Sequence, residues 1–253
     1  MMYNYVMKTN PLNQYLLYQL YHARVLVHSL KYDGKEEELH EFRVALRRIR
    51  SLIKLFFDDS VPFTKSLKTM MKATNTIREL DVLLNSIPPS QFPKLSKQLF
   101  KHRQKIFQTL FTPEFVHQIL LLLDESSDYF FQSDSHFISE ILIQKILTHY
   151  QHCLDTYESL EKNTKPKTLH HLRIQFKDAR YGFEFLEIAD IHESKEIIEY
   201  CKKLQNNLGA IQDATNQIKL LKKMRHEYHT SEIKELLKQR KDSLEKLQKS
   251  HKS

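Results

Sequence analysis

The segment LHEFRVALRRIRSLIKLF, residues Leu39 to Phe56, gives the clearest indication of the fold class of this chain. An α-helix turns by about 100° per residue, and on that geometry the apolar residues of the segment share an arc of about 100°. The residues of this apolar face are Leu39, Phe42, Leu46, Ile49, Ile53 and Phe56. The periodicity predicts an amphipathic helix with one face buried in a core.

A stripe of basic side chains follows the same segment, beside the apolar face. This first basic stripe consists of His40, Arg43, Arg47, Arg50 and Lys54. Its arc is about 80° wide and adjoins the apolar arc instead of opposing it. We therefore expect the stripe at the margin of the core, where it can line a cleft between packed elements.

The segment has a second copy later in the chain. LHHLRIQFKDARYGFEFL, Leu169 to Leu186, aligns with the first copy without a gap at a constant offset, 169 − 39 = 130. Its apolar face comprises Leu169, Leu172, Phe176, Ala179, Phe183 and Leu186, and its second basic stripe comprises His170, Arg173, Lys177 and Arg180. The same offset maps His22 onto His152. A repeat of this size predicts an internal duplication, with two similar bundles related by approximate symmetry.

The composition supports an all-α protein with an anionic partner. The chain has 253 residues, of which 41% are hydrophobic and 28% charged, as in soluble globular proteins. Three glycines and seven prolines are too few for the turns of a many-stranded β protein. The formal net charge of +8 favours a polyanionic partner. The two cysteines, Cys153 and Cys201, form no CxxC pair and are expected as buried thiols.

Helical periodicity extends through nearly the whole chain. The predicted helices cover about 12–30, 36–57, 62–86, 93–111, 113–131, 136–160, 166–189, 193–228 and 231–249, with Gly209 interrupting the eighth. A boundary within 132–135 divides a first helical bundle, 1–134, from a second, 135–253, of one domain, 1–253. The N-terminus lacks a secretory signal, and the richest apolar run, Ile119 to Leu123, is too short to span a bilayer. We therefore expect a cytoplasmic protein without a membrane partner.

The basic stripes indicate a phosphate-binding surface. Like charges at helical spacing repel one another, so either neighbouring acidic side chains or an external polyanion must offset them. A solvated surface is the alternative for one helix, but the same spacing twice favours a ligand site. Arginine offers a planar fork for phosphate oxygens, lysine adds a mobile charge, and histidine adds charge near neutral pH.

Further polar residues extend or support this surface. Lys68, Lys72, Arg78 and Lys202 are predicted to extend it, with ordinary solvated lysines as the alternative. Arg48 and the repeat-related pair His22 and His152 are also predicted contacts of the bound anion. Glu79, Asp81 and Asp213 are expected to pair with stripe arginines, although they could also form a metal or acid–base set. No histidine pair has metal-ligand spacing with a third ligand, and no catalytic motif is present, so we predict neither metal nor cofactor nor catalytic residues.

At these residues the sequence resembles the CHAD family, the conserved histidine α-helical domain. The first-half pattern reads HEFRVALRRIR from His40 and includes Arg48, and the second-half pattern reads KDARYGFE from Lys177. Two further family segments match TNTIRELDV, Thr74 to Val82, and LGAIQD, Leu208 to Asp213. The chain departs from the family at Thr74, Asn75 and Glu79, where leucine, glycine and aspartate are usual, and Asp178 makes the second stripe less basic.

The resemblance implies two pseudo-symmetric antiparallel four-helix bundles with a basic central cavity. It also implies that the helix faces lining this cavity bind inorganic polyphosphate, and that the protein associates with polyphosphate granules. Two other functions stay open on the residues alone. One is hydrolysis or transfer of phosphoryl groups, for which Glu79, Asp81 and Asp213 are the only plausible set. The other is binding of nucleic acid or an acidic protein; nucleic acid is disfavoured because no aromatic residues interleave the stripes.

Overall fold

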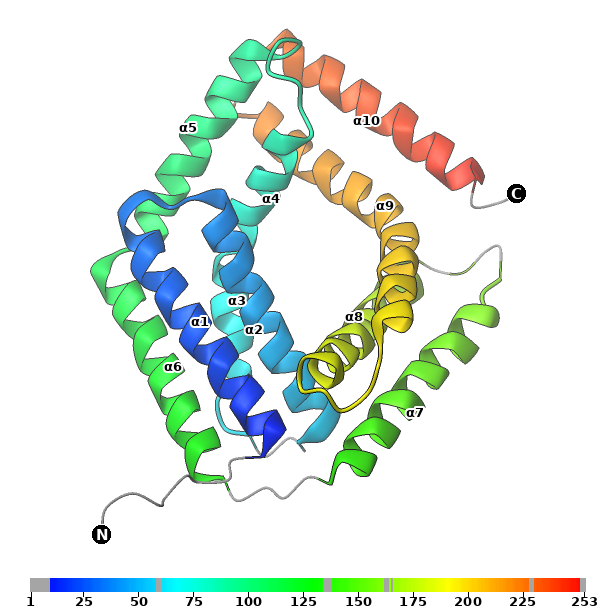
Figure 1. Ribbon diagram of the computed structural model, residues 1–253. Coiled ribbons are helices and arrows are strands. Elements are labelled where there is room, and N and C mark those ends of the chain that lie inside the picture. Colours follow the sequence, from blue (N-terminus) through cyan, green and yellow to red (C-terminus); the bar gives the residue numbers. More distant parts are fainter. Residues whose placement is uncertain are drawn as a thin grey trace.

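The computed structural model describes residues 10–57, 61–133, 138–161, 164, 166–227 and 230–250, and these residues form α-helices and no strand (Figure 1). The helices are α1 (Pro11–Asp33), α2 (Glu36–Phe56), α3 (Thr64–Ala73), α4 (Asn75–Asn85), α5 (Pro93–Leu110), α6 (Pro113–Gln132), α7 (Ser139–Glu158), α8 (Pro166–Ile188), α9 (Lys195–Arg225) and α10 (Ser231–Ser250). The predicted all-α class is confirmed.

The first hairpin, α1 to α2, is defined by local sequence signals at its ends. The Asn10 side chain accepts a hydrogen bond from the backbone N–H of Asn13 at 2.9 Å, which caps the start of α1. Gly34 ends α1 with a left-handed φ of 59°. Three glutamates in the first turn of α2 stabilise its positive end. These signals place the first basic stripe on α2 directly after a tight turn.

The predicted helix over 62–86 is wrong as a single element, because the structure divides it at Thr74 into α3 and α4. The carbonyl oxygen of Met71 accepts hydrogen bonds from Arg43 Nη1 and from the Thr74 hydroxyl, at 2.6 and 3.1 Å. Side-chain donors therefore occupy a carbonyl at the point where the helix breaks. Conversely, the predicted interruption at Gly209 is wrong, because α9 runs through it from Lys195 to Arg225.

Three hydrophobic cores hold the helices together. The apolar faces of α2 and α8 are buried in them, as predicted, except that Leu169 is half-buried. The first core joins α1, α2, α3 and α6 to α7 and α8, and the third joins α7, α8 and α9. The second core joins α4 and α5 to α9 and α10. The cores therefore do not divide at residue 134, and two of them contain residues from both predicted halves.

The order of helix contacts nevertheless follows the repeat. In the first half α1 packs on α2, α2 on α3 and α4, and α4 on α5. In the second half α7 packs on α8, α8 on α9, and α9 on α10. The repeat helices α2 and α8 also contact each other, and so do α4 and α9, whose upper parts meet above them in Figure 1. This contact between α2 and α8 brings the two stripe-bearing helices side by side.

None of the described helices is by itself long and apolar enough to cross a membrane. Within the described part of the chain, α5 and α6 taken together across their 66° bend meet that requirement by length and composition.

Candidate anion-binding site

The two basic stripes meet at Arg47 of α2 and Lys177 of α8. Burial, together with the nearby charges of Arg173 and Arg47 and against the opposing effect of Asp213, lowers the pKa of Lys177 to about 8. Both side chains are half-buried, and neither makes a hydrogen bond or ion pair with another residue that the structure describes. Arg47 therefore lies near enough to Lys177 to influence its pKa, and neither cation is bonded to a carboxylate among the described residues.

Arg43 of the first stripe is a structural residue. Its side chain is buried, and it donates to the Met71 carbonyl at 2.6 Å, to Thr74 Oγ1 at 2.5 Å and to Asn75 Oδ1 at 2.7 Å. Burial lowers its pKa to about 10, with smaller contributions from Arg47 and Arg78. These bonds saturate one end of the guanidinium, so Arg43 fixes the α3–α4 junction.

The equivalent arginine of the second stripe, Arg173, is held differently. Its Nη1 and Nη2 each lie 3.1 Å from one oxygen of Asp213, in a forked pair on the surface of α9. The Arg173 side chain reaches Asp213 by passing over Gly209. Only glycine leaves room for it there, because a Cβ at that position would lie 2.6 Å from Arg173 Nη2. The Asp213 side chain is 51% exposed. Arg173 is therefore paired with a carboxylate that an incoming anion can replace.

A pocket of about 190 Å³ lies between α2, α4 and α9, where Arg43 and Asp213 approach each other. Its lining is of mixed charge and consists of Arg43, Asn75, Arg78, Glu79, Val82, Asp213, Asn216, Gln217 and Leu220. Arg78 is paired with Glu36 of α2 at 3.0 Å. The larger basic cavity implied by the family resemblance stays a prediction.

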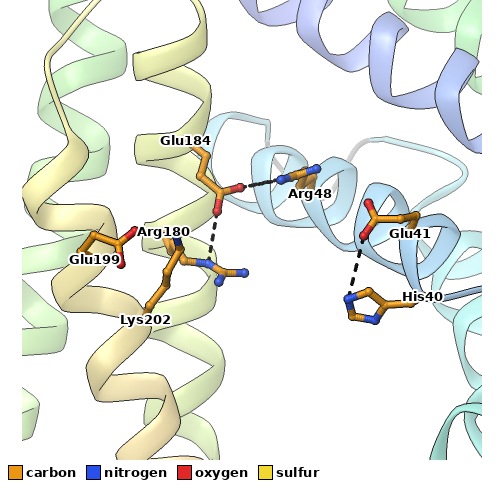
Figure 2. A network of polar contacts seen from close by, with 7 residues as sticks. All are labelled: His40, Glu41, Arg48, Arg180, Glu184, Glu199 and Lys202. Carbon is orange, nitrogen blue, oxygen red and sulfur yellow. Dashed lines mark hydrogen bonds and ion pairs between the residues drawn. The ribbon is translucent and has the colours of Figure 1, made fainter. Parts of the chain in front are cut away.

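Two carboxylates on α8 tie the first stripe helix to the second. Asp178 is buried and accepts hydrogen bonds from Ser51 Oγ at 2.7 Å and Lys54 Nζ at 2.6 Å. Glu184 accepts from Arg48 at 3.0 and 3.1 Å and lies 3.4 Å from Arg180 Nε (Figure 2). Three predicted phosphate contacts, Lys54, Arg48 and Arg180, are thus engaged in internal ion pairs. Asp178 lowers the stripe's charge, as expected, and also joins the helices.

The two stripe histidines, His40 and His170, have pKa values below that of an ordinary histidine side chain. Burial lowers the pKa of His40, and the charges of Arg78 and Arg47 add to the effect. Burial also lowers the pKa of His170, with Arg173 and Lys177 as the next causes. His40 additionally lies 4.0 Å from Glu41 (Figure 2). The fold therefore disfavours the protonated form of both imidazoles.

The other predicted site residues have different neighbours. Arg50 Nη1 contacts Met71 Sδ at 3.4 Å, and Lys202 of α9 pairs with Glu199 at 2.6 Å (Figure 2). Lys68 and Lys72 are exposed on α3. His22 stacks on Tyr18 of α1, whereas His152 lines a groove of about 700 Å³ between α2 and α7 together with Lys54. Among the described contacts, none joins His22 or His152 to Arg47 or Lys177.

The predicted pairing of acidic residues with stripe arginines is confirmed for Asp213 and wrong for Asp81. Asp81 accepts a hydrogen bond from Arg103 Nε at 2.8 Å, and both side chains are buried where α4 packs on α5. Arg103 belongs to neither stripe and was not predicted as a site residue. The sequence contains one indication that Arg103 is buried: it follows the buried residues Leu95 and Leu99 at helical spacing.

Comparisons with known proteins agree with this architecture. Residues 14–222 match the model of the CHAD domain family. A similar solved structure is the crystal structure of the CHAD domain from the plant Ricinus communis, with a TM-score of 0.73 and 19% sequence identity; the match covers 94% of this chain and 84% of that chain. No curated protein matches. Since the family model spans most of the sequence and the fold agrees, this chain belongs to the CHAD domain family.

Proposed function

We propose that this protein binds inorganic polyphosphate at the junction of its two basic stripes. The observation that carries the proposal is the pair Arg47 and Lys177, two half-buried cations from α2 and α8 without an acidic partner among the described residues. Holding them together is unfavourable unless an anion lies between them. A chain of phosphates supplies many closely spaced charges that can serve both stripes at once.

The arrangement of the second stripe supports an anion with phosphate geometry. The Arg173 fork already holds both oxygens of Asp213, and a phosphate presents oxygens to the same planar donors. Because Asp213 is half-exposed, exchange of its carboxylate for phosphate does not bury an unpaired charge. We further propose that the protein acts as a binding module and associates with polyphosphate granules.

The experiment compares polyphosphate binding by the wild type and by Arg47→Gln/Lys177→Gln. Loss of two charge-assisted contacts should weaken binding by at least about tenfold. A matched control is Lys234→Gln/Lys238→Gln, which removes the same charge from exposed positions on α10 and should bind nearly as the wild type does. Equal affinity of the two folded double variants would refute the site. Arg43 is unsuitable for this purpose, because its substitution would disrupt the α3–α4 junction.

Two assays separate this proposal from its alternatives. Phosphoryl chemistry requires available carboxylates; of the predicted set, Asp81 is held by Arg103 and Asp213 by Arg173, whereas Glu79 is exposed at the pocket of about 190 Å³. Release of orthophosphate from polyphosphate with Mg²⁺ or Mn²⁺ would nevertheless favour an enzyme. In a competition experiment at matched charge, preference for single-stranded RNA over polyphosphate would favour a nucleic-acid binder.

A further inference from the structure

The positive charge of the chain is concentrated on two helices outside the basic stripes, α3 and α5. The whole chain contains 39 lysines and arginines and 31 acidic residues, an excess of eight positive charges. The helices α3 and α5 together contain eight basic residues and no acidic one: Lys65, Lys68, Lys72, Lys94, Lys97, Lys101, Arg103 and Lys105. The other residues of the chain therefore carry no net formal charge.

The lysines of these two helices have no partner within the described part of the chain. Arg103 is buried and paired with Asp81, whereas all seven lysines are exposed. None of the seven makes an ion pair or a side-chain hydrogen bond with another residue that the structure describes. The repulsion between neighbouring lysines of each helix is therefore not offset by a carboxylate of the protein, and an external anion would relieve it.

A groove of about 630 Å³ lies between α5 and the junction of α3 with α4. Lys101 and Lys105 line it from α5, and Ala73, the residue after Lys72, lines it from α3. Glu227 is the one carboxylate among the described residues of its lining, and it lies 4.0 Å from the imidazole of His102. An anionic chain in this groove would therefore meet more cations than carboxylates.

The lysines of α3 also lie next to the first basic stripe. Arg50 Nη1 of that stripe contacts Met71 Sδ at 3.4 Å, and Met71 directly precedes Lys72. Arg47, which meets Lys177 where the stripes join, lies one helical turn before Arg50 on α2. Cationic side chains therefore follow one another from the junction of the stripes across α3 to the groove. In Figure 1, α5 lies at the outer edge of the molecule, away from α8 and α9.

We infer that a long polyphosphate chain continues from the junction of the stripes over α3 into the groove beside α5, so that the protein binds long chains more tightly than short ones. The inference rests on the proposed function, because the path begins with polyphosphate at Arg47 and Lys177. Lysine suits the continuation, since its mobile point charge follows a chain without the fixed geometry of an arginine fork. Contacts made by one chain at both places add to its affinity, because the second contact is intramolecular.

Single-stranded nucleic acid fits these helices less well than polyphosphate does. Such strands bind where aromatic side chains stack successive bases. On α3 there is no aromatic residue, and of the two phenylalanines of α5, Phe107 is buried and Phe100 is 52% exposed. One exposed phenylalanine ring does not provide a platform for several bases, whereas polyphosphate has no bases to stack.

A comparison of tripolyphosphate with long-chain polyphosphate tests the path. Lys101→Gln/Lys105→Gln should bind the long chain about tenfold more weakly and tripolyphosphate as the wild type does, and it should lower the slope of log affinity against log salt for the long chain by about two. The matched control, Lys238→Gln/Lys241→Gln, removes the same charge from exposed positions of α10 and should bind both ligands as the wild type does. If the groove variant bound the long chain as this control does, or lost equal affinity for both ligands, the path would be overturned.

Arg47→Gln/Lys177→Gln distinguishes failure of this path from failure of the proposed function. This junction variant should bind both ligands more weakly, because both occupy the junction of the stripes. Loss of long-chain affinity in the junction variant but not in the groove variant would end the chain at the junction, which refutes the path and leaves the proposed function in place. Wild-type affinity of the junction variant for both ligands would refute the proposed function, and the path with it.

Protection of lysines from acetylation locates the chain directly. Long-chain polyphosphate should slow the acetylation of Lys72, Lys101 and Lys105 in the wild type, tripolyphosphate should not, and Lys238 should react equally in both cases. Equal protection by the two ligands would contradict the path. Displacement of long-chain polyphosphate from these lysines by single-stranded RNA at matched charge would assign the groove to nucleic acid and overturn the inference.

Discussion

At the scale of single residues, the repeat predicts the same role for Arg43 and Arg173, and the structure assigns them different ones. Arg43 is buried against Thr74 and Asn75, whereas Arg173 crosses Gly209 to an exposed carboxylate. The spacing on α2 and α8 correctly predicts that both arginines border a core. The different roles of the two arginines depend on the residues that the next helices place beside them, Thr74 and Asn75 for Arg43 and Asp213 for Arg173. The helical periodicity of α2 or α8 alone carries no information about these neighbours. Polyphosphate contact by either arginine stays a prediction.

The pH dependence of polyphosphate binding should follow the protonation of Lys177. Its pKa is about 8 in the unliganded protein, where Arg173, Arg180, Arg47 and Asp213 face it. A bound phosphate favours the charged form and raises this pKa, so affinity should be full below about pH 8 and fall as pH rises through it. Lys177→Arg keeps its charge throughout this range. Titrations at about pH 7 and about pH 9 should therefore show a several-fold loss for the wild type and little for Lys177→Arg. The same loss in both proteins would assign the titration to another group.

At the scale of helices, the amphipathic pattern predicts the positions of most elements but not their breaks. The expected helix over 62–86 is divided because the Arg43 guanidinium, which comes from α2, binds the Met71 carbonyl. The expected break at Gly209 is absent because α9 packs along α8 and buries that glycine. Both outcomes come from tertiary contacts with a neighbouring stripe helix. Local propensity alone assigns a weak break to glycine and none to threonine.

Gly209→Ala should separate binding from stability. Alanine favours a helix over glycine by about 1 kcal/mol, which offsets the loss of the exposed Arg173–Asp213 pair, so the free energy of unfolding should change little. The new Cβ would displace the Arg173 guanidinium, which now lies within 2.8 Å of that position. Polyphosphate affinity should therefore fall.

The contrasting variant is Gly34→Ala. Gly34 has a left-handed φ of 59°, and a Cβ there would lie 2.5 Å from the buried Phe107 ring. We expect a loss of about 2 kcal/mol or more in unfolding free energy, with affinity unchanged while the protein stays folded. Urea unfolding and polyphosphate titration of both variants provide the measurements. If the Gly209→Ala protein bound polyphosphate as the wild type does, binding would not depend on the present position of the Arg173 guanidinium over Gly209.

At the scale of the whole molecule, the order of helix contacts is the one that the sequence repeat predicts, but the cores do not divide between the two halves. The second core joins Leu80 and Leu95 of the first half to Leu221 and Leu236 of the second. Glu232 at the start of α10 also accepts a hydrogen bond from the backbone N–H of Leu95, at 2.7 Å. A repeat in sequence predicts similar pieces, but it does not state whether each piece encloses its own core. Here the C-terminal helix completes a core that α4 and α5 begin.

This shared core predicts that α4, α5 and α10 unfold together, across the boundary between the two halves. Leu236 of α10 is 1% exposed and packs in the second core, so Leu236→Ala should lower the free energy of unfolding by about 3 kcal/mol. Because α4 and α5 use the same core, their amides should lose hydrogen-exchange protection together with those of α10. The matched control is Leu172→Ala, fully buried in the third core on α8, which should first expose α7 to α9. If Leu236→Ala lowered protection in α10 alone, with α4 and α5 unaffected, the halves would fold independently and the shared core would contribute little to either.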